Sequence, residues 1–163
     1  QLAELLSQLE AHRLDVVLTN AVPPRDAATP WIVQLLDQQP VELVGPPEAL
    51  AGDRSLAELL TTENIIVPTV ETSIRAAFDA LVHRLGVVPN LAAEVDDMAL
   101  IRLLARNGEG LAVIPPIVAR DELASGRLVE VAELPGITES FHAITLARKF
   151  PHPHLGAVLA SFE

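Results

Sequence analysis

The hydrophobic positions of the chain change between helical and strand-like spacing. Leu2, Leu5, Leu6 and Leu9 lie at i, i+3, i+4 and i+7, which predicts a helix with one apolar face. The next apolar segment, residues 14–20 (LDVVLTN), has the continuous apolar centre of a strand buried on both sides. Strand-like and helix-like segments then alternate along most of the chain. This alternation predicts an open α/β sheet with crossover helices.

The remaining segments extend the same pattern. Further strands are predicted at residues 32–36, 41–45, 64–68, 90–95, 110–116, 127–132 and 141–147. Further helices are predicted at residues 55–62, 72–85, 97–106, 117–124 and 153–162. We expect Ser55 to cap the first of these helices and Gly86 to end the longest one. Residues 21–30 (AVPPRDAATP) cannot form a helix and are predicted to be an extended loop.

Two proline-containing stretches suggest how the chain is divided. Pro46-Pro47 and Pro135-Gly136 bracket a middle block of alternating elements. We therefore expect one lobe to consist of residues 47–138. The flanking residues 1–46 and 139–163 would come together as the first lobe. Two lobes joined by two crossing segments are the architecture of a hinged ligand-binding protein.

Composition and charge narrow the classes of function. Half of the 163 residues are hydrophobic and the mean hydropathy is +0.35, which indicates a packed globular chain. The net charge of −11 repels a phosphate backbone, so we do not expect this chain to bind nucleic acid by itself. No apolar run approaches the roughly 20 residues that span a bilayer, so no membrane association is expected. The absence of cysteine excludes disulfides and thiol chemistry.

Signatures of catalysis are missing from the sequence. It contains no GxSxG, no HExxH, no glycine-rich phosphate loop after a strand and no Ser/His/Asp set at a recognisable spacing. We therefore expect no enzymatic activity, no catalytic residue and no cofactor.

Four segments, taken in order, carry a family resemblance. They are HRLDVVLTN, VPTVETSIR, EVDDMALIRLLARNGEGLAVIPP and ESFHAITLARKFPHP. Together they resemble the effector-binding domain of LysR-type transcriptional regulators, and the resemblance covers nearly the whole chain. EVDDMAL and FHAITLARKFPHP are closer still to one branch, the Na⁺/H⁺ antiporter regulatory proteins, which are sodium-responsive activators.

The resemblance implies a fold and a working arrangement. The expected fold is a periplasmic-binding-protein-like (type 2) α/β domain with open mixed sheets and an effector cleft between its two lobes. In the family, a DNA-binding winged helix-turn-helix and the first strand and helix of the first lobe come earlier in the chain. Neither is recognisable ahead of Gln1, so we expect a longer natural chain and a first lobe that is incomplete here.

The resemblance also implies partners and a location. We expect a small-molecule or ion effector, assembly as a homodimer or homotetramer, and contact with DNA only through the missing N-terminal domain. The implied location is the cytoplasm. Within the branch, the signal would be sodium or alkalinity and the response an ion-homeostasis gene. The sequence does not identify the effector.

The candidate site follows from where the predicted strands end. In open α/β sheets, ligands bind beyond the carboxyl ends of the strands, where helix N-termini offer free N–H groups. In the family, the turns at these positions line the effector cleft. The predicted effector-binding residues are therefore Thr19, Asn20, Thr69, Thr72, Ser73, Asp96, Asp97 and Pro115. Thr72 is also well placed to cap its helix, and this interpretation is preferred because threonine is a common capping residue.

Asp96 and Asp97 have two interpretations. Carboxylate oxygens suit a hard cation such as sodium. An aspartate is also a strong helix cap, and a second acidic residue is common in the first turn. Two neighbouring side chains at a helix start point in different directions, whereas an alkali ion needs several converging oxygens. The cap is the preferred interpretation, and we predict no other metal site.

Two histidine motifs each allow a functional and an ordinary structural interpretation. His152-Pro153-His154 offers fewer ligands than the three or four of a transition-metal site, so a solvated helix start is expected. His142 lies in a predicted crossing strand, where it could sense pH, although packing is the commoner role of such a histidine.

Two other classes of protein share this architecture. A free-standing solute-binding protein of a transporter is the main alternative, and sequence ahead of Gln1 would distinguish it. An enzyme built on the two-lobe fold is the third class, for which a turnover assay would be the evidence.

Overall fold

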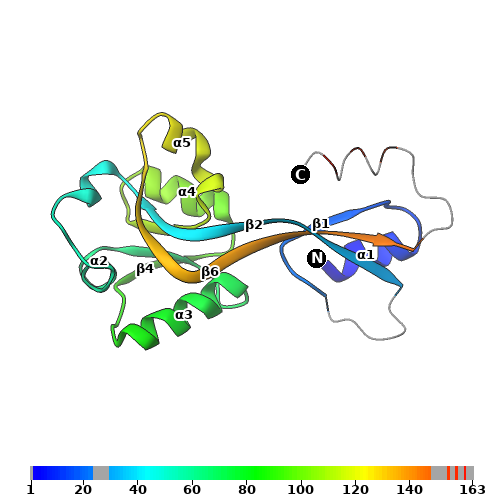
Figure 1. The fold of residues 1–163 in the computed structure, drawn as a ribbon, viewed down its shortest axis with the longest axis horizontal. Coiled ribbons are helices and arrows are strands. Elements are labelled where there is room, and N and C mark those ends of the chain that lie inside the picture. The colour runs from blue at the N-terminus through cyan, green and yellow to red at the C-terminus, as the bar shows by residue number, and fades with distance from the viewer. Residues whose placement is uncertain (1, 24–29, 148–153, 155–156, 158–159, 161–163) are drawn as a thin grey trace. The chain divides into compact units, whose positions relative to one another are not determined.

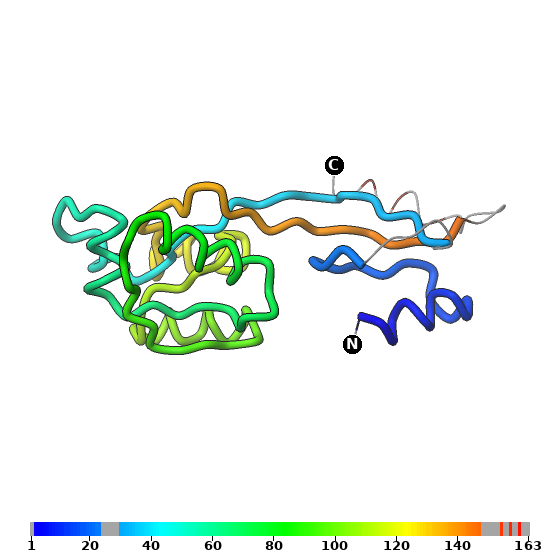
Figure 2. Tube along the Cα trace, turned by 90° about the horizontal axis from the view of Figure 1, so that it is seen from below, coloured from blue at the N-terminus to red at the C-terminus, as the bar shows by residue number. Residues whose placement is uncertain are grey.

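The chain forms two compact units, which we describe separately. The computed structural model describes residues 2–23, 30–147, 154, 157 and 160. Residues 1–38 and 140–163 make unit 1, and residues 39–139 make unit 2. The chain passes between the units twice, within strand β2 (Trp31–Gly45) and within strand β6 (Val129–Leu146), which run side by side (Figures 1 and 2). That these units are the two lobes of an effector-binding domain, one of them incomplete, stays a prediction.

Unit 2 contains most of the regular structure. Between β2 and β6 its elements are the 3-10 helix η1 (Pro47–Leu50), α2 (Leu56–Thr62), β3 (Ile65–Pro68), α3 (Ser73–Leu85), β4 (Leu91–Val95), α4 (Met98–Arg106), β5 (Leu111–Ile114), the 3-10 helix η2 (Pro116–Ala119) and α5 (Arg120–Ala124).

The sheet is open and mixed. Its strand order is β1-β6-β2-β5-β3-β4. The short strand β3 pairs in parallel with β4 on one side and with β5 on the other. Strand β2 joins β5 in the antiparallel direction, with Leu43 opposite Val113. The predicted α/β fold with an open mixed sheet is confirmed.

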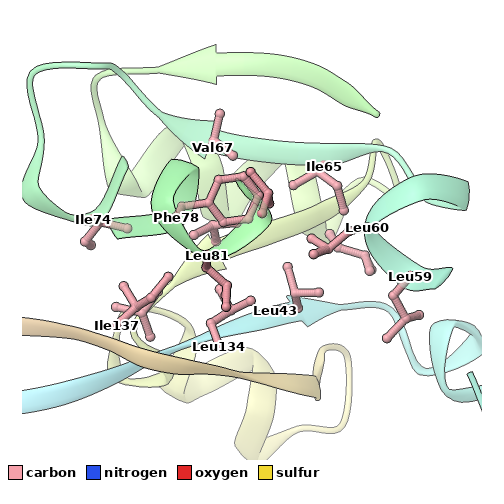
Figure 3. Close-up of a cluster of buried hydrophobic side chains, with 14 of the residues drawn as sticks. Leu43, Leu59, Leu60, Ile65, Val67, Ile74, Phe78, Leu81, Leu134 and Ile137 are labelled. Carbon is pink, nitrogen blue, oxygen red and sulfur yellow. The ribbon is translucent and has the colours of Figure 1, made fainter. Parts of the chain in front are cut away.

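Both faces of the sheet in unit 2 are covered by helices. Ile65 and Val67 of β3 pack with Phe78 of α3 in a cluster that also includes side chains of α2, β2 and β6 (Figure 3). The intervening Ile66 packs on the other face with Ile101 of α4. This alternation follows the two-residue period of a strand. Burial on both faces explains why β3 and β5 are continuous apolar runs in the sequence.

Unit 1 is built around the predicted N-terminal helix, α1 (Leu2–Glu10). Leu6 and Leu9 of α1 pack against Val17 of β1 (Val17–Thr19) and Ile144 of β6. Strands β1 and β6 are antiparallel, with Val17 opposite Ile144. The predicted apolar face is therefore buried at Leu6 and Leu9 and partly buried at Leu2, whereas Leu5 is exposed.

Two predicted strand breaks are wrong. Residues 32–36 and 41–45 belong to the single strand β2, and residues 127–132 and 141–147 belong largely to the single strand β6. The two long strands are sheet neighbours, and each one continues through polar and proline-containing positions. Gly136 allows this in β6 because it adopts a φ of +79°, which a side chain would disfavour. Leu134 and Ile137, on either side of the predicted break, both remain in the core.

Helix boundaries follow the local signals in the sequence. Ser55 forms a capping box with Glu58, and the hydrogen bonds from Ser55 lower the pKa of that glutamate. Gly86 ends α3 with a φ of +67°. The helix predicted at 117–124 is instead η2 followed by α5, and the helix predicted at 153–162 lies mostly outside the described residues. Within the described part of the chain, no helix has the length and apolarity to cross a membrane.

Three acidic side chains make the stability of unit 2 depend on pH. Partial burial, followed by the negative charges of Glu130 and Glu133, raises the pKa of Glu42 above its usual value of 4.5. The native state therefore holds this proton more tightly than the unfolded state, and stability falls as the pH rises through the raised pKa. We expect Glu42→Gln to raise the melting temperature at neutral pH. Thermal melts should show the gain shrinking as the pH falls through the raised pKa and absent below 4.5, where both states are protonated.

A control is needed because any lost carboxylate reduces the charge of an acidic chain. Glu109→Gln removes one charge from an exposed side chain away from this cluster and should have a smaller effect at neutral pH. Equal gains from the two variants would mean that net charge, not the local cluster, sets the effect.

Candidate ligand site at the strand ends of unit 2

Three parallel strands of unit 2 end at one edge of the sheet. Thr69 follows β3, Asp96 follows β4 and Pro115 follows β5. Because β4 and β5 both run parallel to β3, these three positions share the carboxyl edge. The amide of Thr69 donates a hydrogen bond of 3.2 Å to the carbonyl of Val95, which ties the first turn to the end of β4.

The turn from Thr69 to Ser73 leads into α3. The hydroxyl of Thr72 accepts a hydrogen bond from the Arg75 amide at 3.2 Å and donates one to the Thr69 carbonyl at 3.0 Å. Thr72 is therefore the N-cap of α3, as its capping interpretation predicted. Ser73, the first residue of the helix, has an exposed side chain. These hydrogen bonds within the turn fix its backbone conformation.

Arg75 is a buried side chain that links the elements forming this edge. Its residue is only 7% exposed, and its guanidinium donates to the buried carbonyl of Pro68 at 3.2 Å. The same group forms ion pairs of 2.9 Å with Asp79 and with Glu94. The hydrogen bond to Glu94, with a further one to Asp79, raises the pKa of Arg75. One side chain thus joins the end of β3, the end of β4 and the first turns of α3.

The predicted site residues do not include Arg75. A signal was present, because the arginine lies next to the buried Ile74 and three residues before the buried Phe78 on an otherwise apolar helix face. A cation in such a position needs partners, and Asp79 at i+4 supplies one of them.

Asp97 is the N-cap of α4. Its Oδ1 accepts hydrogen bonds from the amides of Ala99 at 2.7 Å and Leu100 at 3.3 Å. The cap interpretation is confirmed for Asp97, with the helix starting one residue later than predicted. Asp96 precedes the cap and is exposed. The two aspartates therefore have different roles, and Asp96 is the one not used in capping.

The other predicted residues contribute in different ways. Pro115 is buried, caps η2 through its backbone and accepts a hydrogen bond from Val118 at 3.0 Å. It shapes the edge without offering a polar side chain. Across the described residues, no three histidine or acidic side chains are grouped in a way that could hold a metal ion. A cation role for Asp96 and Asp97 stays a prediction.

Thr19 and Asn20 belong to unit 1. Thr19 ends β1, and its hydroxyl accepts a hydrogen bond from the Ala21 amide at 3.0 Å. His142 of β6 lies opposite Thr19, and its Nδ1 is buried without a hydrogen-bond partner in the described part of the chain. The effector roles of Thr19 and Asn20 and the pH-sensing role of His142 stay predictions. His152 and Pro153 lie outside the described residues.

Comparison with known proteins identifies the family. The family model described as LysR substrate binding domain matches residues 1–163, which is the whole chain. The chain belongs to this family. The predicted resemblance to the effector-binding domain of LysR-type regulators is confirmed.

Individual relatives agree with the family. The transcriptional activator protein NhaR of Escherichia coli (strain K12) is 21% identical over 151 residues, covering 91% of this chain and 49% of NhaR. The chain thus spans about half the length of the curated relatives it matches. Vibrio fischeri DarR, solved in complex with DNA, has a TM-score of 0.77 at 14% identity over 100% of this chain and 56% of DarR. The effector binding domain of QuiR, solved with shikimate, has a TM-score of 0.65 at 15% identity over 98% of this chain and 74% of that one. These likenesses confirm the predicted fold.

Proposed function

We propose that this LysR substrate binding domain senses a small molecule or ion at the edge formed by the ends of β3, β4 and β5. The observation that carries the proposal is the Thr69–Ser73 turn, which Thr72 closes and Arg75 supports from within the fold. A binding edge that is already rigid does not have to be ordered when the ligand arrives. The predicted site residues Asp96, Asp97 and Pro115 follow the other two strands of the same edge.

The chemistry of the edge favours a small cation, and we propose sodium. Glu71, Asp96 and Asp97 are exposed there, whereas the charge of Arg75 is buried and paired with Glu94 and Asp79. Hydroxyl, carbonyl and carboxylate oxygens are the ligands of hard cations. Asp97 Oδ1 is already used in capping, so Asp96 is the carboxylate we assign to the ion.

The proposed mechanism is a shift between conformations of a longer regulator. An effector changes such an equilibrium by as much as its affinities for the two states differ. DarR, a structural neighbour, was solved with DNA, and QuiR was solved with shikimate. By analogy, we propose a cytoplasmic homodimer or homotetramer that binds its effector without turnover and contacts DNA through a separate domain.

Sodium binding should be visible as stabilisation. A ligand at 100 times its Kd adds about 2.7 kcal/mol if it binds the folded state alone. We expect NaCl and LiCl to raise the melting temperature above that in KCl at equal ionic strength. The difference should disappear in Asp96→Asn. Asp97→Asn is the matched variant, because asparagine caps a helix as well as aspartate does, and it should retain at least part of the rise.

Identical melting curves in the three salts would exclude sodium as the effector. The family membership would stand, and small organic acids such as shikimate would become the next probes. A sodium-specific rise that survives Asp96→Asn would mean that sodium binds somewhere other than this edge.

A further inference from the structure

A polar hollow lies between α4 and α5 in unit 2. It has a volume of about 370 Å³. Its lining comes from α4, from α5 and from the turn that follows α5. The lining residues are Arg102, Arg106, Asp121, Glu122, Ser125 and Arg127. Arg106 is in the last turn of α4, at the opposite end of that helix from Asp97, so this hollow is separate from the strand-end site.

The three arginines of the hollow differ from the structural arginines of this chain. Arg54 donates hydrogen bonds to Glu63 and to the Ala49 carbonyl, and Arg75 donates to three acceptors. Within the described residues, the guanidinium groups of Arg102, Arg106 and Arg127 donate no hydrogen bond to a protein acceptor. The chain has only 11 basic residues against 22 acidic ones, so three arginines around one hollow, facing the acidic Asp121 and Glu122, are a local excess of positive charge.

Glu122 places an acceptor among these donors. Its side chain is only 9% exposed, and its carboxylate lies 3.7 Å from Arg102 and 3.9 Å from Arg106. Both distances exceed those of hydrogen bonds, and Oε2 of Glu122 has no hydrogen-bond partner among the residues that the structure describes. A buried carboxylate oxygen without a hydrogen bond is costly. The hollow therefore suits a ligand that accepts hydrogen bonds from arginine and also donates one to Glu122.

We propose that this hollow binds a phosphate group that carries a proton. Arg102, Arg106 and Arg127 would donate to the phosphate oxygens, and Glu122 would accept the hydrogen bond of the P–OH group. The last ionisation of such groups has a pKa of about 6 in phosphate monoesters, so the protonated form is available near neutral pH. Sulfate has the same shape but no proton to donate at this pH. Glu122 is therefore the residue that selects phosphate over sulfate.

Calorimetric titration of the whole chain tests both parts of the proposal. Inorganic phosphate, glycerol phosphate and sulfate would be added at matched ionic strength. We expect phosphate to bind more tightly than sulfate, and binding of glycerol phosphate would show that an esterified phosphate is accepted as well. Arg106→Gln should weaken phosphate binding about tenfold, the loss expected for one charge-assisted hydrogen bond. Arg120→Gln is the control, since Arg120 is an exposed arginine of α5 outside the lining.

The Glu122→Gln variant separates ligand selection from a purely structural role. An amide can donate a hydrogen bond as well as accept one, so the variant should bind sulfate and phosphate with similar affinity. A thermal melt of each variant shows whether it is folded at the titration temperature. Equal binding of sulfate and phosphate by the unaltered chain would overturn the proposal. So would an Arg106→Gln variant that behaves like Arg120→Gln, or no detectable phosphate binding. None of these results depends on whether sodium binds at the strand ends.

Discussion

Truncation of Phe78 to alanine is expected to destabilise unit 2 by about 3–5 kcal/mol, as for other buried phenylalanines. Phe78 is fully buried and packs in the cluster that joins α3 to β3 and β5 (Figure 3). The chain is poor in aromatic residues, and Phe78 is the largest fully buried side chain among the described residues. Typical domains have only about 5–15 kcal/mol of stability in total. Urea unfolding should show a much lower midpoint.

A graded comparison separates loss of volume from other effects. Phe78→Leu keeps an apolar side chain of intermediate size and should lose distinctly less stability than Phe78→Ala. A loss below about 1 kcal/mol for Phe78→Ala would mean that the core around α3 does not depend on this ring. The proposed site would then not depend on this packing.

The sequence was a good guide wherever local chemistry decides the structure. Ser55, Thr72 and Gly86 set helix ends through their own hydrogen bonds or backbone angles, and each was predicted. The continuous β2 and β6 strands were not predicted, because pairing between residues far apart in the chain outweighs a local proline. Gly110 shows the same limit. A side chain there would meet the Asn64 carbonyl oxygen at 2.5 Å, a close approach that depends on how β5 lies beside β3.

Individual residues of the candidate site were predictable from the sequence, but the tertiary contacts that bring them together were not. Strand ends can be located from apolar runs followed by capping residues, which identified Thr69, Thr72 and Asp97. The strand order β5-β3-β4, which gives these residues a shared edge, depends on tertiary pairing. The position of Glu122 beside Arg102 and Arg106 also depends on how α5 packs on α4. The spacing of residues along the chain predicts neither the strand order nor the packing of α5 on α4.

Replacement of Arg75 by methionine is expected to cost about 2–3 kcal/mol and to loosen the Thr69–Ser73 turn. Methionine keeps much of the length and apolar volume of the side chain, so the loss is mainly polar. The hydrogen bond to the buried Pro68 carbonyl involves a charged donor, and such bonds contribute about 1.5–3 kcal/mol. The carboxylates of Asp79 and Glu94 are about half exposed, and exposed ion pairs contribute about 0–1 kcal/mol each.

Three further variants decide which of these interactions matters. Asp79→Asn and Glu94→Gln each remove one ion pair and should cost less than Arg75→Met. Arg84→Met removes a positive charge from the exposed end of α3, where the effect should stay below about 1 kcal/mol. Urea unfolding gives the order of stability, and the sodium-dependent melting shift reports on the turn. If Glu94→Gln costs as much as Arg75→Met, the link to β4 is the main contribution and the Pro68 carbonyl is secondary. If Arg75→Met loses stability but keeps an unchanged sodium response, Arg75 supports the fold of unit 2 without positioning the site.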